Sequence, residues 1–376
     1  NAFSDWLKQN YSANYVLSDL VKKGIGIHNG KLHRSLSQIQ VKLFEDKNCL
    51  NNIISTSSII EGVNTSAENI IIWSNKNGKA NLTNFIYKNI AGRGGRMFKH
   101  FIGKVYLLDK PLQDTPTQLE LEFTEDLINS LNGQVELNEE QEKKREAFYA
   151  EMDDLLGQGV YKKVLEENLL QTFRSSKLKE IAQDMKQDIF KWNCLKNLNS
   201  PNPGIWENAL YKILKQLGWT SYRHSDIVKY IMRMSDNWRC SIPELLGNKI
   251  TIEEFFEIER EVSFKVSSML NDVVCLYKLI SKQDIDVSPF IAKLSHAFLP
   301  KNVYELEEYG LPRMLSKKIQ TNGIINLEDS SIPLHAIITE FNSIGVENVK
   351  QNLGEKLHLF ENYILDYFYD GIRSEN

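Results

Sequence analysis

The hydrophobic pattern changes between residues 110 and 120, and this change sets the kind of fold that the chain can adopt. Before it, short β-branched runs alternate with helical stretches; after it, apolar residues recur with helical spacing. Strands that alternate with helices favour a mostly parallel sheet flanked by helices. The sequence therefore predicts an α/β domain over residues 3–110, followed by a mainly α-helical half.

Four short runs in the α/β part have the composition of strands. Each is rich in Ile or Val and is bounded by Gly, Asn or Ser, as is typical of strands in a buried parallel sheet. They lie in the segments GIGIHNG (24–30), LNNIISTSS (50–58), NIIIWS (69–74) and GKVYLL (103–108). Helices are expected over 33–46 and directly after Thr83, whose hydroxyl can cap the first turn. Asn77-Gly78 predicts a hairpin turn.

Two further domains are expected after residue 110. Residues 111–200 would form a helical connector, and a Pro- and Asn-rich break, NLNSPNPG, precedes a helical domain over 201–376. Within that domain Arg313 and Lys317 share one helix face, next to Lys318. Such a face could touch phosphates or could simply be solvated.

The composition excludes several classes of protein. The 376 residues include 45 Lys and Arg against 49 Asp and Glu, so the net charge of −4 excludes a histone-like polycation but not a local nucleic-acid-binding surface. The four cysteines are scattered without a Cys-x-x-Cys pair, which predicts no metal site and a reduced, cytoplasmic chain. No apolar run approaches the roughly 20 residues that span a bilayer. Asn1-Ala2, without Met, suggests part of a longer protein.

Three short segments carry most of the candidate chemistry. The first places His28 and Asn29 directly after a predicted strand. The second is the hydroxyl-rich STSSIIEGVN of residues 55–64, and the third is NIAGRGGR of residues 89–96. Glycines allow a backbone to approach an anion closely, and the two arginines offer planar, permanently charged donors to phosphate. A solvated, Gly-rich surface turn is the alternative for the third segment.

In this order the three segments resemble motifs of superfamily-two DEAD/DEAH-type helicases, in particular the Ski-like branch. That branch includes exosome RNA helicases, repair helicases and antiphage-defence helicases. The resemblance covers roughly the first 110 residues and implies that they form the second RecA-like domain of such an enzyme. It also implies a winged helix within residues 111–200 and a helical ratchet domain over 201–376, with a single strand of DNA or RNA in a central channel.

The resemblance assigns roles at an ATP site between two RecA-like domains. Arg96 would be the arginine finger, and Arg93 a second donor to the γ-phosphate. Asn89 stands where the family usually has Gln, so its shorter side chain reaches less far toward the attacking water or phosphate. The residues expected near the nucleotide are Gly62, Asn64 and Gly92.

The resemblance also assigns contacts to the nucleic-acid backbone. These residues are His28, Asn29, Thr56 and Ser57. Small hydroxyls and backbone amides can hold a phosphate without reading a base. Capping of a strand end is the alternative for each hydroxyl, and a structural role is the alternative for His28. The hairpin at Asn77-Gly78 would stand where relatives carry a strand-separating pin, or would be only a turn.

Two motifs that an ATPase needs are absent from the chain. It has no Gly-x-x-x-x-Gly-Lys-[Ser/Thr] loop and no Asp-Glu magnesium motif. The resemblance places both in an upstream RecA-like domain, which would bind ATP and provide most of the contacts to Mg²⁺. The chain alone should therefore not hydrolyse ATP. The expected function is the C-terminal part of an ATP-dependent nucleic-acid helicase or translocase. The alternative is a non-catalytic nucleic-acid-binding or partner-docking scaffold with a RecA-like fold.

Overall fold

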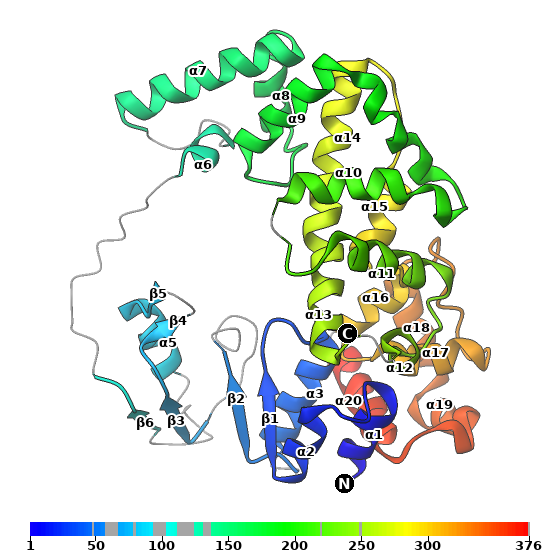
Figure 1. Cartoon of the computed structure of the whole chain (residues 1–376). Helices are drawn as coiled ribbons and strands as arrows, with labels where there is room; N and C mark the ends of the chain where they lie inside the picture. Colours follow the sequence, from blue (N-terminus) through cyan, green and yellow to red (C-terminus); the bar gives the residue numbers. More distant parts are fainter. Residues whose placement is uncertain are drawn as a thin grey trace. The chain divides into compact units, whose positions relative to one another are not determined.

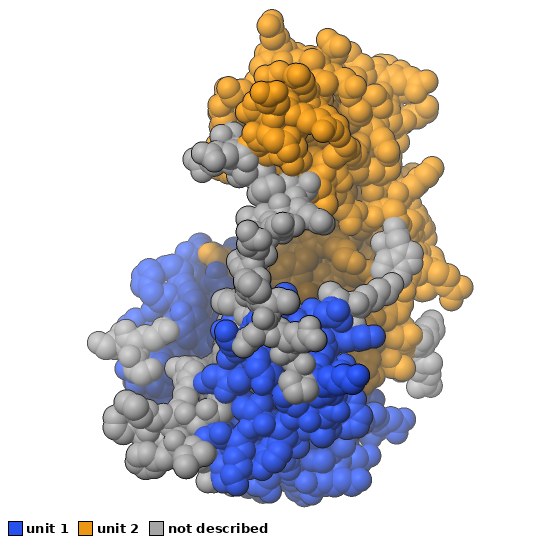
Figure 2. Space-filling model, turned by 90° about the vertical axis from the view of Figure 1, so that its left-hand side faces the viewer, with its two compact units in different colours: residues 1–120, 241–243, 302–376 blue, residues 121–240, 244–301 orange. Residues whose placement is uncertain are grey.

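The chain forms two compact units in the computed structural model (Figure 1 and Figure 2). Unit 1 contains residues 1–120, 241–243 and 302–376, and unit 2 contains residues 121–240 and 244–301. The residues that the structure describes are 1–46, 49–56, 67–77, 80–92, 103–110, 124–130, 137–218, 220–247 and 250–374. The last helices of the chain therefore belong with its first 120 residues, an association that the sequence pattern does not reveal.

The N-terminal part of unit 1 alternates helices with short strands. Its helices are α1 (Ala2–Asn10), α2 (Val16–Lys22), α3 (Arg34–Glu45) and α5 (Asn84–Ala91). Its strands are β1 (Ile25–His28), β2 (Asn52–Ser55), β3 (Asn69–Ile72), β4 (Lys76–Asn77), β5 (Ala80–Asn81) and β6 (Lys104–Leu107). The individual strands and helices expected here are confirmed, and so is the cap: Thr83 Oγ1 accepts the Ile86 amide at 3.2 Å.

The strands pair two by two. β1 is parallel to β2, β3 is parallel to β6, and β4 is antiparallel to β5. Within the described ranges, no ladder of hydrogen bonds joins one of these pairs to another, and most of the chain is helical. The predicted RecA-like fold, with one parallel sheet as its core, is therefore wrong.

The edge of β1 that does not pair with β2 supplies one physical reason why the strands do not form a single sheet. Gln40 of α3 is fully buried, and its Oε1 accepts the Ile27 amide at 2.8 Å. Its Nε2 donates to the Leu36 carbonyl at 3.3 Å. A Cβ at Gly26 would lie 3.1 Å from Gln40 Oε1, so glycine gives this side chain the room it needs. The amide of Gln40 thus occupies a strand edge that a further strand would otherwise use.

Burial supplies a second reason. Strands inside a parallel sheet are covered on both faces, and the Ile-rich sequences of β2 and β3 predict such burial. Ile54 of β2 and Ile71 of β3 are instead exposed. A short run of Ile identifies a strand, but it does not establish that other elements cover both faces of that strand.

The C-terminal part of unit 1 is helical. Its helices are α16 (Lys301–Glu308), α17 (Arg313–Thr321), α18 (Leu334–Ile344), α19 (Val346–Leu353), a 3₁₀ turn (Gly354–Lys356) and α20 (Leu359–Ser374). The ring of Phe360 stacks on Phe3 of α1 with 4.6 Å between centroids. A Cβ at Gly310, where φ is +88°, would lie 2.7 Å from Tyr367 Cε1. Helix α20 therefore packs tightly on both α1 and the turn that precedes α17.

The described residues of unit 2 form helices and the loops between them, without a strand. The helices are α6 (Glu125–Ser130), α7 (Glu139–Leu156), α8 (Val160–Glu166), α9 (Ser175–Gln187), 3₁₀ segments (Ile189–Asn199 and Pro203–Ile205), α10 (Glu207–Leu217), α11 (His224–Asp236), α13 (Ile252–Arg260), a π segment (Glu261–Val266), α14 (Ser267–Ser281) and α15 (Ser288–Ser295). Helix α12 (Ile242–Leu246) crosses the boundary between the units. No strand lies in the described part of 124–200, where a winged helix was expected.

Helix α7 shows how one of these helices is specified. Asn138 and Gln141 form a reciprocal capping box: Asn138 Oδ1 accepts the Gln141 amide at 2.9 Å, and Gln141 Oε1 accepts the Asn138 amide at 3.1 Å. Phe148, Met152 and Leu156 recur every four residues and are buried. The helical character that the sequence predicts for this part of the chain is confirmed.

Candidate nucleic-acid interface

The carboxyl ends of β1 and β2 meet at one edge of their parallel pair. The register places His28 opposite Ser55, and the Thr56 amide donates to the His28 carbonyl at 3.2 Å. His28, Asn29 and Thr56 therefore lie together, although α3 separates them along the chain. Figure 1 shows β1 and β2 side by side. Ser57, the fourth residue expected at the nucleic-acid backbone, lies outside the described residues.

A tight turn follows β1. Oδ1 of Asn29 accepts the Lys31 amide at 2.9 Å, the arrangement of an Asx turn. The side-chain oxygen of Asn29 thus holds the loop, while its NH₂ group is the chemical donor that it could offer to a phosphate oxygen. Lys31 and Arg34 follow at exposed positions, and Arg34 Nε lies 3.5 Å from Glu308 Oε2.

The charge of His28 is set by its surroundings. The imidazole is buried, and this burial, with a smaller effect of the positive Arg34, lowers its pKa below the usual 6.5. The ring is therefore neutral at pH 7. A neutral imidazole can form a hydrogen bond but brings no charge, so the positive charge near this edge comes from Lys31 and Arg34.

The residues expected around the nucleotide are only partly described. Asn89 is exposed on the last turn of α5, and Gly92 ends that helix with its amide donating to the Lys88 carbonyl at 2.8 Å. Four residues of this set lie outside the described residues: Gly62, Asn64, Arg93 and Arg96. The nucleotide site therefore stays a prediction.

The hairpin between β3 and α5 is anchored at its base. β4 and β5 pair through Lys76 with Asn81 and Asn77 with Ala80, which confirms the predicted hairpin. Asn75 holds its start: its carbonyl accepts the Leu82 amide at 2.7 Å, and its amide donates to Asp109 Oδ2 at 3.2 Å. Gly78 lies outside the described residues, and a role as a strand-separating pin stays a prediction.

The basic face expected around Arg313 is largely occupied within unit 1. Arg313 is buried, and its Nε and Nη2 donate to the two carboxylate oxygens of Glu307 at 3.0 and 2.9 Å. Lys318 Nζ donates to Glu361 Oε2 at 2.6 Å. Arg313 and Lys318 therefore form neither a solvated face nor a phosphate-binding one, because both side chains form ion pairs within the fold.

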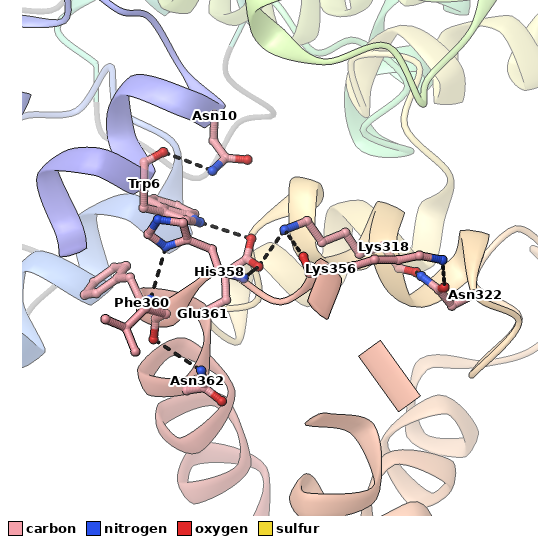
Figure 3. A network of polar contacts seen from close by, with 10 residues as sticks. Trp6, Asn10, Lys318, Asn322, Lys356, His358, Phe360, Glu361 and Asn362 are labelled. Atoms are coloured by element: carbon pink, nitrogen blue, oxygen red, sulfur yellow. Dashed lines mark hydrogen bonds and ion pairs between the residues drawn. The ribbon is translucent and has the colours of Figure 1, made fainter. Parts of the chain in front are cut away.

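Glu361 is the centre of a polar network that the sequence does not reveal (Figure 3). Its Oε1 accepts the Trp6 Nε1 proton at 3.1 Å, and its Oε2 accepts both Lys318 Nζ and the His358 amide, the latter at 2.9 Å. The side chain is fully buried. Its sequence context, the aromatic run LHLFENYILDYFYDGI, is the one signal that an interior position was to be expected.

The described residues contain neither a metal-type cluster nor a membrane-spanning helix. No cluster of three or more His, Cys, Asp or Glu side chains there has the arrangement of a metal site. In the same residues, no helix combines the length and the apolar character required to cross a bilayer.

Comparison with known proteins gives one partial similarity. No model of a protein family matches the chain. A stretch of 118 residues, 31% of the chain, is 37% identical to anti-bacteriophage protein B of Escherichia coli K12. The matched stretch spans 16% of that protein, so the similarity is to a small part of it. Over that stretch the chain is similar to a protein named for action against bacteriophages.

Proposed function

We propose that this chain is part of an antiphage-defence protein that moves along single-stranded DNA or RNA and is driven by ATP hydrolysis. In this proposal the edge formed by β1 and β2 contacts the nucleic-acid backbone through Asn29 and Thr56. Arg96 completes the ATP site, and an upstream domain supplies the phosphate-binding loop and the magnesium ligands. The protein would act in the cytoplasm.

One observation carries the proposal. The pairing of β1 with β2 brings together residues from two separate motifs that resemble nucleic-acid-contacting motifs of Ski-like helicases. The order of those motifs, followed by the GRGGR segment, adds support from the sequence. The name of the partly similar protein supports the assignment to defence against bacteriophages.

The test is ATP hydrolysis by the natural protein that contains this chain, measured with and without single-stranded DNA and RNA. We expect stimulation by at least one type of strand. Arg96→Ala should lower the stimulated rate on the order of a thousandfold, because an arginine finger stabilises transition-state charge. Lys88→Ala, which changes an exposed residue on α5, should leave the rate within about twofold of wild type. An unchanged rate in Arg96→Ala would remove this residue from the mechanism.

A second candidate is a nucleic-acid-binding protein without ATPase activity. Two observations favour it: the strand pairs are not joined into one sheet among the described residues, and Asn89 replaces the usual Gln. It predicts salt-dependent binding of single strands but no ATP hydrolysis under any condition. The hydrolysis assay therefore separates the two candidates.

A further inference from the structure

One face of the β3–β6 pair is apolar, aromatic and exposed. The register pairs Ile71 with Tyr106, and the Leu108 amide continues the ladder by donating to the Ile72 carbonyl at 3.0 Å. Trp73 follows two residues after Ile71 and is 81% exposed, while Tyr106 is 47% exposed. Because side chains two residues apart in a strand share a face, Ile71, Trp73, Tyr106 and Leu108 lie on the same side.

The opposite face of the same pair is more covered. Ile72 is buried, and Val105 and Leu107 are partly buried. The exposure therefore alternates along both strands instead of affecting the whole pair. We name the exposed side, which consists of Asn69, Ile71, Trp73, Lys104, Tyr106 and Leu108, the aromatic face.

Three lysines and two acidic residues lie on or next to the aromatic face. Lys104 lies on it, and Lys76 and Lys110 follow the ends of β3 and β6 at exposed positions. The two acidic side chains nearby in sequence are Glu68 and Asp109. The Asp109 carboxylate accepts the Asn75 and Lys110 amides at 3.2 and 2.8 Å, so it holds the backbone at the end of β6.

We propose that the aromatic face binds unpaired bases of a single strand, which stack on Trp73 and Tyr106 while the lysines contact the phosphates. Exposed aromatic rings among basic residues are the usual means by which proteins hold single strands without reading their sequence. This inference rests on the proposed function, because it assumes a nucleic-acid partner. The aromatic face would be a second contact surface, in addition to the edge of β1 and β2. It would bind the bases of the strand, whereas that edge contacts the nucleic-acid backbone.

Binding of a fluorescent single-stranded oligonucleotide to the 376-residue chain tests the inference. Trp73→Ala should weaken binding about tenfold or more, whereas Trp73→Phe should retain most of it because a ring remains available for stacking. Phe190→Ala is the matched control: Phe190 is 78% exposed in unit 2 but is not part of the aromatic face. Its removal should leave the affinity unchanged. Since Trp73 is so exposed, thermal unfolding of all three variants should match wild type.

The outcomes separate this inference from the proposed function. If the wild-type chain binds neither DNA nor RNA strands, the nucleic-acid function itself fails. If the chain binds a strand and Trp73→Ala binds it equally well, the function stands and the stacking surface is refuted. A third result would also refute it: a wild-type dimer that Trp73→Ala converts to a monomer with unchanged affinity would assign the aromatic face to protein association.

Discussion

Two fully buried carboxylates, Glu361 in unit 1 and Asp272 in unit 2, are satisfied by different kinds of donor. Glu361 accepts from the Lys318 ammonium, from the Trp6 indole and from a backbone amide. Asp272 lies on α14 and accepts from the amides of Gln171 and Thr172 and from the Thr172 hydroxyl, at 2.7, 2.9 and 2.5 Å. Only the first of the two carboxylates thus has a positively charged side chain among these partners.

The two sets of donors give the two carboxylates different roles in their units. Glu361 joins three segments that are far apart in the sequence, and its charge is compensated by Lys318. Asp272 fixes one loop, the connection between α8 and α9, through neutral donors. Burial without a compensating charge raises the pKa of Asp272 above the usual 3.8, although the hydrogen bonds act in the opposite direction. The charge of Asp272 therefore depends on pH over a range that extends above the usual one.

The largest effect is expected when the charge of Glu361 is removed. Glu361→Gln leaves Lys318 without its anionic partner. It also places an NH₂ group where one oxygen now accepts, either next to Trp6 Nε1 or next to Lys318 Nζ and the His358 amide. Loss of one member of a buried ion pair costs about 3–5 kcal/mol, and the lower end applies because the Lys318 side chain is 25% exposed. Urea unfolding followed by tryptophan fluorescence measures the change.

A surface pair provides the control for this experiment. Glu347 pairs with Lys350 at 3.1 Å, but its side chain is 81% exposed. Glu347→Gln should therefore lower the free energy of unfolding by less than about 1 kcal/mol. If the two variants lose the same stability, the network in Figure 3 does not hold unit 1 together in the way proposed.

The features of unit 1 that the sequence predicts correctly are local ones. Strands, helices, the Thr83 cap and the hairpin follow from neighbouring residues, and all of them are present. The RecA-like sheet required contacts between strands that are distant in the sequence, and those contacts are decided by side chains such as Gln40, whose buried position no local pattern announces. For the same reason, the burial of Arg313 and Glu361 in ion pairs could not be predicted.

An intermediate effect is expected at Asp272. Asp272→Asn places an amide NH₂ where an oxygen now accepts from Thr172, and the unmatched donors should cost about 2 kcal/mol. Because the pKa of Asp272 is raised in the folded protein, the folded state binds this proton more tightly than the unfolded chain. The stability that this carboxyl contributes is therefore greatest at low pH and falls as the pH rises from 3.8 through the raised pKa.

The raised pKa of Asp272 predicts how the effect of Asp272→Asn on stability changes with pH. The stability difference between wild type and Asp272→Asn should narrow as the pH rises above 3.8. Hydrogen exchange of the Gln171 and Thr172 amides reports on unit 2 directly, since both donate to this side chain. A difference that widens with pH would mean that the hydrogen bonds outweigh burial and that the pKa of Asp272 is lowered instead.

The candidate site illustrates a similar division between local and distant information. The sequence placed His28, Asn29 and Thr56 in separate motifs, and the strand register brings them to one edge. The lowered pKa of His28 results from burial of its ring and from the positive charge of Arg34, and no local pattern indicates either of them. The aromatic face was overlooked for a related reason, because an Ile-rich run with a Trp reads equally well as a buried strand.

The smallest effect is expected for the hydroxyl of Thr172. Thr172→Val keeps the shape of the side chain and the backbone amide, but it removes the donor at 2.5 Å from Asp272 Oδ2. One lost hydrogen bond should lower stability by about 1 kcal/mol, and the pKa of Asp272 should rise further because this hydroxyl lowers it. Thr339→Val is the control, since the Thr339 hydroxyl donates to the His335 carbonyl at an exposed position of α18. It should change stability by less than about 0.5 kcal/mol at every pH. Equal losses in the two variants would show that neutral donors add nothing specific at a buried carboxylate, and the contrast with Glu361 would then rest on Lys318 alone.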